Sequence, residues 1–276
     1  MRTKVEKTIL YVILTALSIL FLSPTLIVIM NSFKGKLYIS NEPFQLPNEQ
    51  TFSGITNFIS GIEKTGFLSA LKWSLFITIG ATIVIVFFTS MTAWYITRVK
   101  TRFTKFLYYL IVFSMVVPFQ MVMFTMTKVA NTLSLDNPVG LIILYLGFGA
   151  GLSTFMYVGF IKSIPLEIEE AAMIDGCNPI QNFFLIVMPM LKPITTTIAI
   201  LNVMWVWNDY LLPYLIVGTD YATIPIAVQY LRGGYGSIDM GAMMALLVIA
   251  IIPIVIFYSV CQKYIIEGIA DGAVKS

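Results

Sequence analysis

Six long apolar stretches separated by polar segments dominate the hydrophobicity pattern of this 276-residue chain. They run near 9–30, 74–96, 106–127, 139–161, 193–216 and 241–261. Each is long enough for one membrane span, because a helix needs about 20 mostly apolar residues to cross a bilayer core. No segment alternates as a half-buried strand does, and no internal repeat or soluble domain is visible. The pattern predicts an all-α integral membrane protein in which residues 1–276 form a single domain of six transmembrane helices.

Two features refine this pattern. Pro24, Pro118 and Pro253 lie inside predicted spans, and we expect continuous helices there because membrane helices tolerate proline where neighbours satisfy the freed carbonyl groups. In the first polar segment, residues 31–72, apolar side chains recur with helical spacing at Ile55, Phe58, Ile59 and Ile62. They predict a short amphipathic helix at the outer membrane interface.

The composition agrees with a membrane protein and excludes several functions. Hydrophobic residues make up 58% of the chain and charged residues 11%, against about 25% charged in a typical soluble protein. There is no histidine, and the two cysteines, Cys177 and Cys261, lack metal-ligand spacing. We therefore expect no catalytic residue, no metal site and no nucleic-acid binding. The first apolar stretch is longer than the core of a signal peptide, which predicts an uncleaved first helix.

Basic residues beside the spans predict the orientation in the membrane. They cluster in the N-terminal tail and in the short turn after the second span, at Arg2, Lys4, Lys7, Arg98, Lys100, Arg102 and Lys105. Cytoplasmic loops carry an excess of lysine and arginine. Both termini and the polar segment 163–192 are thus expected in the cytoplasm.

The segment 163–192 carries the signals of two short helices. Pro165 suits a first helical turn, and Glu167, Glu169 and Glu170 would lie near the positive end of the helix dipole. Gly176 suits the position that ends a helix in a left-handed conformation. Asn178, Pro179 and Gln181 then predict a second start, with Asn178 as N-cap and Gln181 at the third position.

The same segment resembles the EAA loop of ATP-binding-cassette (ABC) importer permeases. The resemblance consists of Glu-Ala-Ala, a glycine four residues after the last alanine, and an Ile and a Pro further on; it departs from the family only by Met188 in place of leucine. It implies that the loop docks on a separate ATPase subunit through Glu170, Ala171, Ala172, Met173, Asp175, Gly176, Ile186 and Pro189. The alternative is an interfacial helix that only connects two spans.

Trp205 to Tyr210 is similar to a Trp-Asn-acidic-aromatic segment of carbohydrate-uptake permeases. Asp209 is the one acidic residue well inside a predicted span, about 24 Å along a helix that starts near Pro193. The functional interpretation is a pathway or gate formed by Trp207, Asn208, Asp209 and Tyr210. The alternative is a structural cap in which Asp209 accepts hydrogen bonds from backbone or from Asn208.

Two further segments add to the resemblance. Residues 267–276 are similar to the tail of the G-type permease subunit of maltose-type transporters, which implies that a C-terminal tail, 262–276, reaches the ATPase by an extended path through Gly268, Asp271, Gly272 and Lys275. A frayed terminus is the alternative. The loop after the fifth span would be an external recognition element for a binding protein or its sugar, or else a plain connector; its candidate residues are Tyr221, Arg232, Gly233, Gly234 and Tyr235.

Taken together, these similarities imply the transmembrane domain of a type I ABC importer in the bacterial cytoplasmic membrane. The chain would be a permease subunit for a sugar, with an oligosaccharide as the expected cargo. It has no phosphate-binding loop, so we expect no cofactor in this chain, and ATP and Mg²⁺ would bind to a partner. The expected partners are a second homologous permease, two ATPase subunits, an extracytoplasmic sugar-binding protein and membrane lipids.

Two alternative functions remain. One is an ABC permease for a non-sugar solute such as a polyol or glycerol phosphate. The other is a stand-alone secondary transporter or membrane enzyme, which would be expected to place ionisable residues on several spans, whereas only Asp209 is so placed. The sequence does not identify the sugar.

Overall fold

The computed structural model describes residues 4–229, 231 and 239–273, with only the backbone described for 264–273. Over these ranges the chain is helical, and it contains no β-strand beyond one isolated bridge between Lys34 and Phe52. The chain divides into two compact units, one formed by 1–68 and 227–255 and the other by 69–226 and 256–276. The all-α prediction is therefore confirmed for the described residues.

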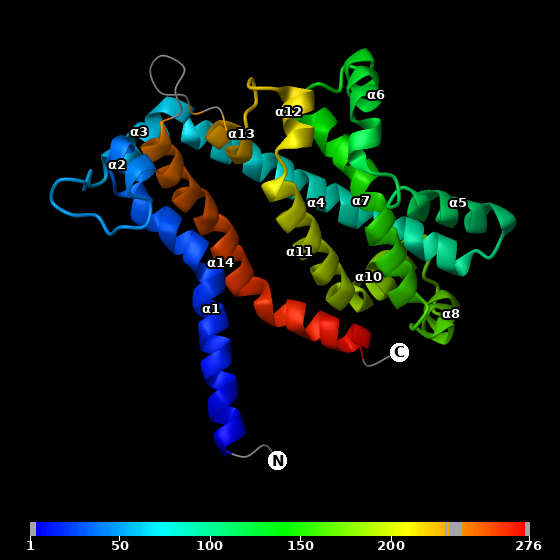
Figure 1. Ribbon diagram of the computed structural model, residues 1–276. Helices are drawn as coiled ribbons and strands as arrows, with labels where there is room; N and C mark the ends of the chain where they lie inside the picture. The colour runs from blue at the N-terminus through cyan, green and yellow to red at the C-terminus, as the bar shows by residue number, and fades with distance from the viewer. Residues whose placement is uncertain (1–3, 230, 232–238, 274–276) are drawn as a thin grey trace. The chain divides into compact units, whose positions relative to one another are not determined.

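The first unit contains α1 (Lys4–Ser32), α2 (Lys36–Asn41), α3 (Thr56–Thr65) and the beginning of α14 (Met240–Ala273) (Figure 1). The amide of Asn57 on α3 donates hydrogen bonds of 2.8 Å to the carbonyl oxygens of Ser32 and Lys34. Lys64 forms a 2.6 Å ion pair with Asp239 just before α14. The predicted amphipathic helix is thus present as α3, and polar contacts hold it to both neighbouring segments.

The second unit is built around α7 (Pro138–Ile161), which packs against α5, α11 and α12. Its other helices in chain order are α4 (Phe67–Arg98), α5 (Arg102–Phe113), α6 (Phe119–Thr132), α8 (Leu166–Ile174), α9 (Pro179–Gln181), the π-helix η1 (Asn182–Val187), α10 (Met188–Met190), α11 (Lys192–Asn208) and α12 (Leu211–Val217), with α13 (Ile224–Gln229) at the boundary between the units. Asn137 caps α7 by accepting hydrogen bonds from the N–H groups of Val139 and Gly140.

Close approach between helices in this unit requires a small residue on α7. A Cβ atom added to Gly149 would lie 2.6 Å from Ile85 of α4 and 3.0 Å from the amide oxygen of Asn202 of α11. Membrane helices associate through close van der Waals packing, because lipid provides no hydrophobic driving force between them, and small residues permit that close packing. The core around this point is formed by residues such as Ile77, Ile85 and Tyr145.

Four described helices are long and apolar enough to cross a membrane: Lys4–Ser32, Phe67–Arg98, Pro138–Ile161 and Met240–Lys263. A fifth candidate is the pair Pro179–Met190 and Lys192–Asn208, which is bent by 76°. The helices predicted near 9–30, 74–96, 139–161 and 241–261 correspond to the first four. Pro24 and Pro253 lie inside helices, as expected.

The prediction of one continuous helix over 106–127 is wrong. The structure has two helices, α5 and α6, separated by residues 114–118. Pro118 has an extended backbone and precedes α6. A proline removes one helical N–H and its ring clashes with the carbonyl four residues earlier, here Ser114, where the helix has ended.

The continuous helix predicted over 193–216 is also interrupted. α11 ends at Asn208, Asp209 has an extended backbone with ψ of 126°, and α12 begins at Leu211. Pro213 explains the position of the break, because its ring would clash with the carbonyl of Asp209 in a continuous helix.

The last predicted span, 241–261, agrees with the membrane-span candidate Met240–Lys263, but the helix that contains it is longer. α14 continues to Ala273, so the backbone at Gly268 and Gly272 is helical and does not follow the expected extended path. The side chain of Asp271 and all of Lys275 lie outside the described part of the chain.

Candidate functional site

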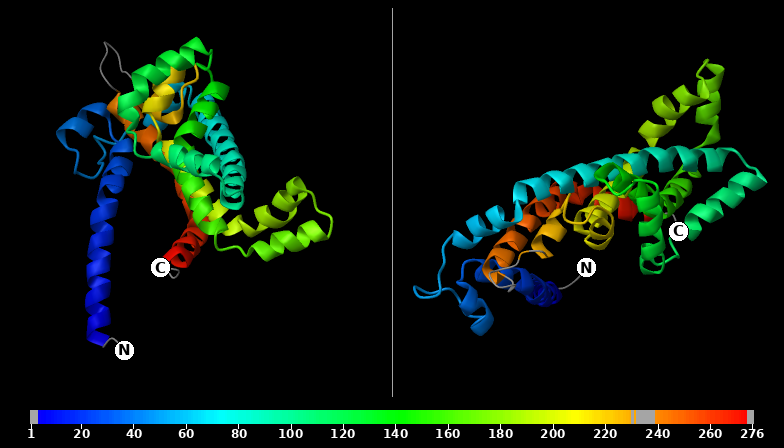
Figure 2. Two further views of the ribbon diagram at one scale, coloured as in Figure 1. Left: turned by 90° about the vertical axis from the view of Figure 1, so that its right-hand side faces the viewer. Right: turned by 90° about the horizontal axis from the view of Figure 1, so that it is seen from above.

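The segment 163–192 folds as a helical hairpin that projects from the rest of the second unit in both views of Figure 2. Its first arm, α8, begins after Pro165 and carries Glu167 and Glu169 in its first turn. Its end has the predicted glycine. Gly176 has φ of +92°, the Cys177 N–H donates to the Ala172 carbonyl at 3.0 Å, and the Gly176 N–H donates to the Met173 carbonyl at 3.1 Å. This pair of bonds is a Schellman motif.

The second arm starts as the sequence predicts. The Gln181 N–H donates to the Asn178 side-chain oxygen at 2.9 Å, and the Asn178 N–H donates to the Gln181 side-chain oxygen at 3.0 Å. This reciprocal capping box fixes the entry into α9, with Pro179 at the first helical position. The helix continues through η1 and α10 and then bends by 76° into α11. The expected helix, break and helix are all present.

A buried carboxylate anchors the hairpin to the end of α4. Glu169 is 2% exposed, and its Oε1 accepts hydrogen bonds from Arg98 Nε at 2.8 Å and Nη2 at 2.6 Å. Its Oε2 accepts from the indole N–H of Trp94 at 2.8 Å. Arg98 Nη2 also donates to the Ile164 carbonyl at 3.1 Å. We call Trp94, Arg98 and Glu169 the anchor cluster. Its hydrogen bonds to the carboxylate are charge-assisted, and such bonds are stronger than those between neutral groups.

Sequence reasoning did not find this cluster. The sequence predicts only a favourable interaction with the helix dipole for Glu169 and only a cytoplasmic position for Arg98. Glu169 and Ala172 are three residues apart and share a face of α8, and the structure shows that both are buried. The partners of Glu169 lie about seventy residues away in the sequence, so only the tertiary fold reveals them.

Apolar packing supports the second arm of the hairpin. Phe183 and Val187 of η1 are buried with Leu191 against Tyr157 and Ile161 of α7. The ring of Phe183 also lies 5.3 Å from that of Trp94. Since Trp94 belongs to the anchor cluster, the polar and apolar contacts meet at one residue of α4.

Much of the remaining surface of the hairpin is exposed and partly apolar. Ile174 is 85% exposed, Ile180 69% and Met173 47%. Among the residues predicted to dock, only Ala172 is buried and Ile186 is half-buried; the others are exposed, namely Glu170, Ala171, Met173, Asp175, Gly176 and Pro189. The arrangement provides one anchored face and one free face that combines carboxylates with apolar side chains.

Asp209 lies at the break between α11 and α12. Its carboxylate accepts a hydrogen bond from the Tyr145 hydroxyl at 2.9 Å and one from the Leu211 N–H at 3.1 Å. Asn208 is exposed and donates to the Met204 carbonyl at 2.7 Å. The carboxylate therefore caps α12, as the structural alternative predicts, although its second partner is Tyr145 and not Asn208.

The other residues predicted near Asp209 have different surroundings. Trp207 is buried at 7% exposure, and Tyr210 stacks on Tyr214 with ring centres 5.3 Å apart. In the predicted external loop, Tyr221 is half-buried and packs edge-on against Trp73 at 5.0 Å. The remaining loop candidates, Arg232, Gly233, Gly234 and Tyr235, lie outside the described residues.

Within the described ranges, no group of three or more acidic, histidine or cysteine side chains could hold a metal ion. Cys177 and Cys261 are both free thiols.

Comparison with known proteins identifies what the chain is similar to. Residues 85–271 match the family described as binding-protein-dependent transport system inner membrane component. The chain is 36% identical over 275 residues to a probable starch degradation products transport system permease protein of Thermoanaerobacterium thermosulfurigenes, covering 99% of both chains. It is 37% identical over 270 residues to a multiple sugar-binding transport system permease protein of Streptococcus mutans, covering 96% of both.

A solved structure with a similar fold is a chain from the crystal structure of a bacterial alginate ABC transporter in complex with an alginate pentasaccharide-bound periplasmic protein. The TM-score is 0.64, the sequence identity is 17%, and the match covers 94% of this chain and 92% of that chain. At this identity the likeness concerns the fold alone.

Proposed function

This chain belongs to the family of binding-protein-dependent transport system inner membrane components, and on that basis we propose that it is the permease subunit of an ATP-driven oligosaccharide importer. The observation that carries the cargo class is the similarity over nearly the whole length to two permeases named for sugar transport. The resemblance noted in the sequence to carbohydrate-uptake permeases is confirmed. The specific sugar would be identified from the ligand of the binding protein.

The proposed topology has six spans with both termini in the cytoplasm. Four spans are single helices, α5 and α6 together form one interrupted span, and α11 and α12 form another. Six spans supply half of a translocation pathway in this family, so a second homologous permease completes it. The basic residues at Lys100, Arg102 and Lys105 support this orientation.

The hairpin is the proposed contact with the ATPase. Its free face offers Ile174 and Met173 for apolar contact and Glu170 for a charged hydrogen bond. The anchor cluster then joins the docked helix to α4. Closure of the ATPase dimer would move α8 and the end of α4 together as a rigid body, which is a common form of switching transition.

The tail and the external loop have proposed roles that rest on the resemblance alone. Gly268, Asp271, Gly272 and Lys275 are proposed to contact the ATPase, and Tyr235 with its neighbours to contact an extracytoplasmic sugar-binding protein. ATP and Mg²⁺ would bind only to the ATPase partners.

The test is reconstitution. A tagged chain is purified from its native membrane, and co-purifying subunits are identified; proteoliposomes with and without them are then assayed for ATP-driven uptake of labelled malto-oligosaccharides. We expect uptake only with a second permease, an ATPase and a binding protein present. Uptake by this chain alone would overturn the proposal, and a binding protein that carries a polyol or glycerol phosphate would establish the alternative cargo.

A further inference from the structure

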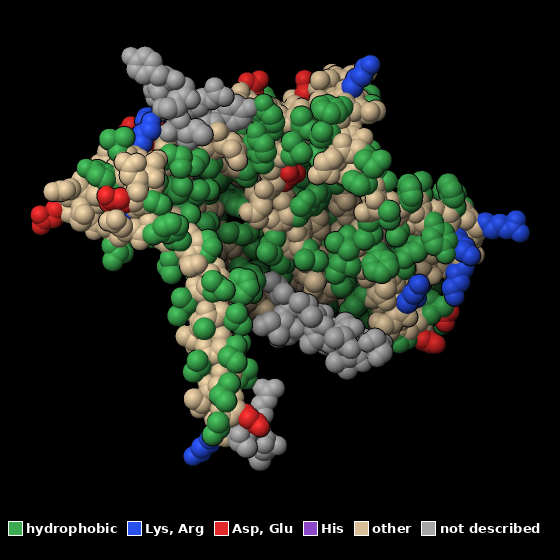
Figure 3. All heavy atoms as spheres, viewed as in Figure 1, with side chains coloured by type: hydrophobic (Ala, Val, Ile, Leu, Met, Phe, Trp, Pro, Cys, Tyr) green, Lys and Arg blue, Asp and Glu red, His purple; other side chains and the backbone are tan. Residues whose placement is uncertain are grey.

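A basic pocket of about 530 Å³ lies between the end of α4, the beginning of α5 and the end of α7. Its lining includes four cations, Lys100, Arg102, Lys105 and Lys162, together with Tyr108 and Tyr109. No acidic side chain is among the described residues that line it. Figure 3 shows the same concentration of lysine and arginine side chains over the turn between α4 and α5.

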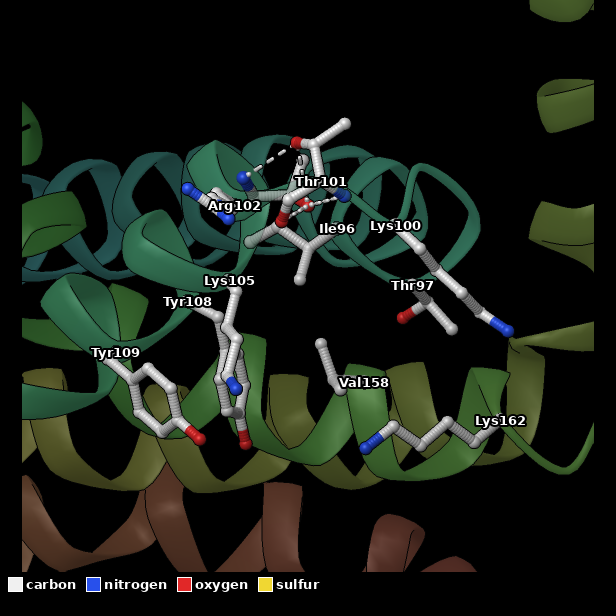
Figure 4. A pocket seen from close by; sticks show the side chains of 11 residues that line it. Ile96, Thr97, Lys100, Thr101, Arg102, Lys105, Tyr108, Tyr109, Val158 and Lys162 are labelled. Atoms are coloured by element: carbon white, nitrogen blue, oxygen red, sulfur yellow. Dashed lines mark hydrogen bonds between the residues drawn. The ribbon is translucent and has the colours of Figure 1, made fainter.

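The lining side chains come from different helices and share one space. In Figure 4, Lys105, Tyr108 and Tyr109 extend from α5 toward α7, and Lys162 extends from the end of α7 into the same space, while Lys100 and Arg102 lie toward its edges. Within the described part of the chain, none of the four cations forms an ion pair. Four unpaired positive charges around one pocket repel each other, so an anion would relieve that repulsion.

The position of the pocket indicates which anion. The exposed face of α5 beside it carries large apolar side chains with helical spacing, at Phe103, Phe106, Leu110 and Phe113, each more than half exposed. Such a stripe suits acyl chains, whereas a cluster of lysines, tyrosine hydroxyls and a helix beginning suits a phosphate group. Topology alone requires positive charge at this membrane face, but it does not require the charges to converge on a pocket with two tyrosines.

We propose that this pocket binds the phosphate headgroup of an anionic phospholipid, with its acyl chains along the apolar stripe of α5. The inference rests on the proposed orientation, which places this end of the helices at the cytoplasmic leaflet. Lys105 and Lys162 would contact the phosphate from opposite sides, and the hydroxyls of Tyr108 and Tyr109 would donate hydrogen bonds. A bound lipid would thereby link α5 to the end of α7, from which the hairpin emerges.

The test uses the assembled transporter, purified from bilayers of equal parts phosphatidylglycerol and phosphatidylcholine, with bound lipid counted by native mass spectrometry. The test variant is Lys105→Gln with Lys162→Gln; the control is Lys128→Gln with Lys192→Gln, two exposed lysines that do not line the pocket. At about fivefold per interfacial charge, we expect the test variant to lose roughly 25-fold in phosphatidylglycerol affinity. The control should retain the wild-type preference.

A second variant protects the test against effects on insertion. Tyr108→Phe with Tyr109→Phe keeps every charge and should reduce phosphatidylglycerol retention about threefold. Equal retention in wild type and both pocket variants would overturn the inference, as would displacement of the lipid by inorganic phosphate, or a loss of ATPase binding without a loss of lipid. Sugar uptake that persists while lipid retention falls would leave the proposed function intact and separate the two conclusions.

Discussion

Removing the buried carboxylate of the anchor cluster should release α8 from α4. In Glu169→Ala, Arg98 loses both of its hydrogen bonds to Oε1, and Trp94 loses the acceptor of its indole N–H. Breaking a buried ion pair by removing one partner typically costs about 3–5 kcal/mol. The Arg98 side chain retains 17% exposure and a bond to the Ile164 carbonyl, so water can partly solvate it, and we expect a cost near the lower limit, about 3 kcal/mol.

The magnitude can be measured as amide hydrogen exchange in α8, because local opening of a helix is governed by its own free energy. A loss of about 3 kcal/mol corresponds to an increase of roughly 100-fold in exchange for the amides of α8. Measured on the chain without the ATPase, Glu170→Ala is the matched control, since it removes an adjacent carboxylate that is exposed. In the reconstituted transporter, Glu169→Ala should also hydrolyse ATP with little uptake, because the docked helix would move without α4.

Two outcomes would refute this reasoning. If Glu169→Ala and Glu170→Ala exchanged at the same rate in α8, the ion pair would not hold the helix. If exchange increased but uptake per ATP stayed at the wild-type ratio, the anchor cluster would stabilise the hairpin without transmitting movement. Glu169→Gln separates charge from hydrogen bonding, because its amide oxygen can still accept from Trp94; we expect an intermediate increase.

Four further outcomes are expected. Gly176→Val should abolish uptake, because a β-branched residue is strained at φ of +92° by about 1–3 kcal/mol. Gly176→Asn should retain most of the uptake. Normal uptake by Gly176→Val would contradict the role of Gly176 in ending α8. Glu170→Ala should weaken binding of the ATPase in detergent by roughly 10- to 100-fold, and unchanged affinity would exclude a charged contact there. Deletion of 268–276 should lower binding-protein-stimulated ATP turnover at matched assembly, and full stimulation would show that the tail has no role. Partial burial raises the pKa of Asp239, but hydrogen bonds from Lys64 and the Ala242 N–H, together with the nearby lysine charges, lower this pKa overall. Hydrogen-exchange protection at the start of α14 should therefore fall as the pH drops through the lowered pKa. Lys64→Met should flatten this pH profile.

Local signals in the sequence were sufficient for the helix ends of the hairpin. The capping box at Asn178 and the glycine stop at Gly176 depend on residues at most five positions apart, and both occur as predicted. The breaks at 114–118 and 209–210 are not predicted, because each lies within a stretch that is apolar overall, while the backbone cannot remain helical four residues before Pro118 and Pro213. Apolar patterning therefore located the helices and did not determine where each one is interrupted.

The anchor cluster could not be predicted for a different physical reason. Glu167, Glu169 and Glu170 are the same type of side chain in one turn of sequence, and composition cannot decide which is buried. The choice is made by the position of Arg98 and Trp94 on a helix far away in the sequence. A buried carboxylate needs such partners, since an unpaired charge there would cost several kcal/mol.

Adjacent glutamates on α8 consequently have opposite environments. Consecutive residues on a helix point about 100° apart, so when Glu169 faces Arg98, Glu170 must face outward, where it is exposed. The burial of one carboxylate thus determines the presentation of the next. In the proposed function, a single helix then contacts the ATPase through Glu170 and α4 through Glu169, with one peptide bond between the two contacts. A rigid connection of that length leaves little room for α8 to move without α4, which is why the loss of Glu169, and not of Glu170, should uncouple hydrolysis from transport.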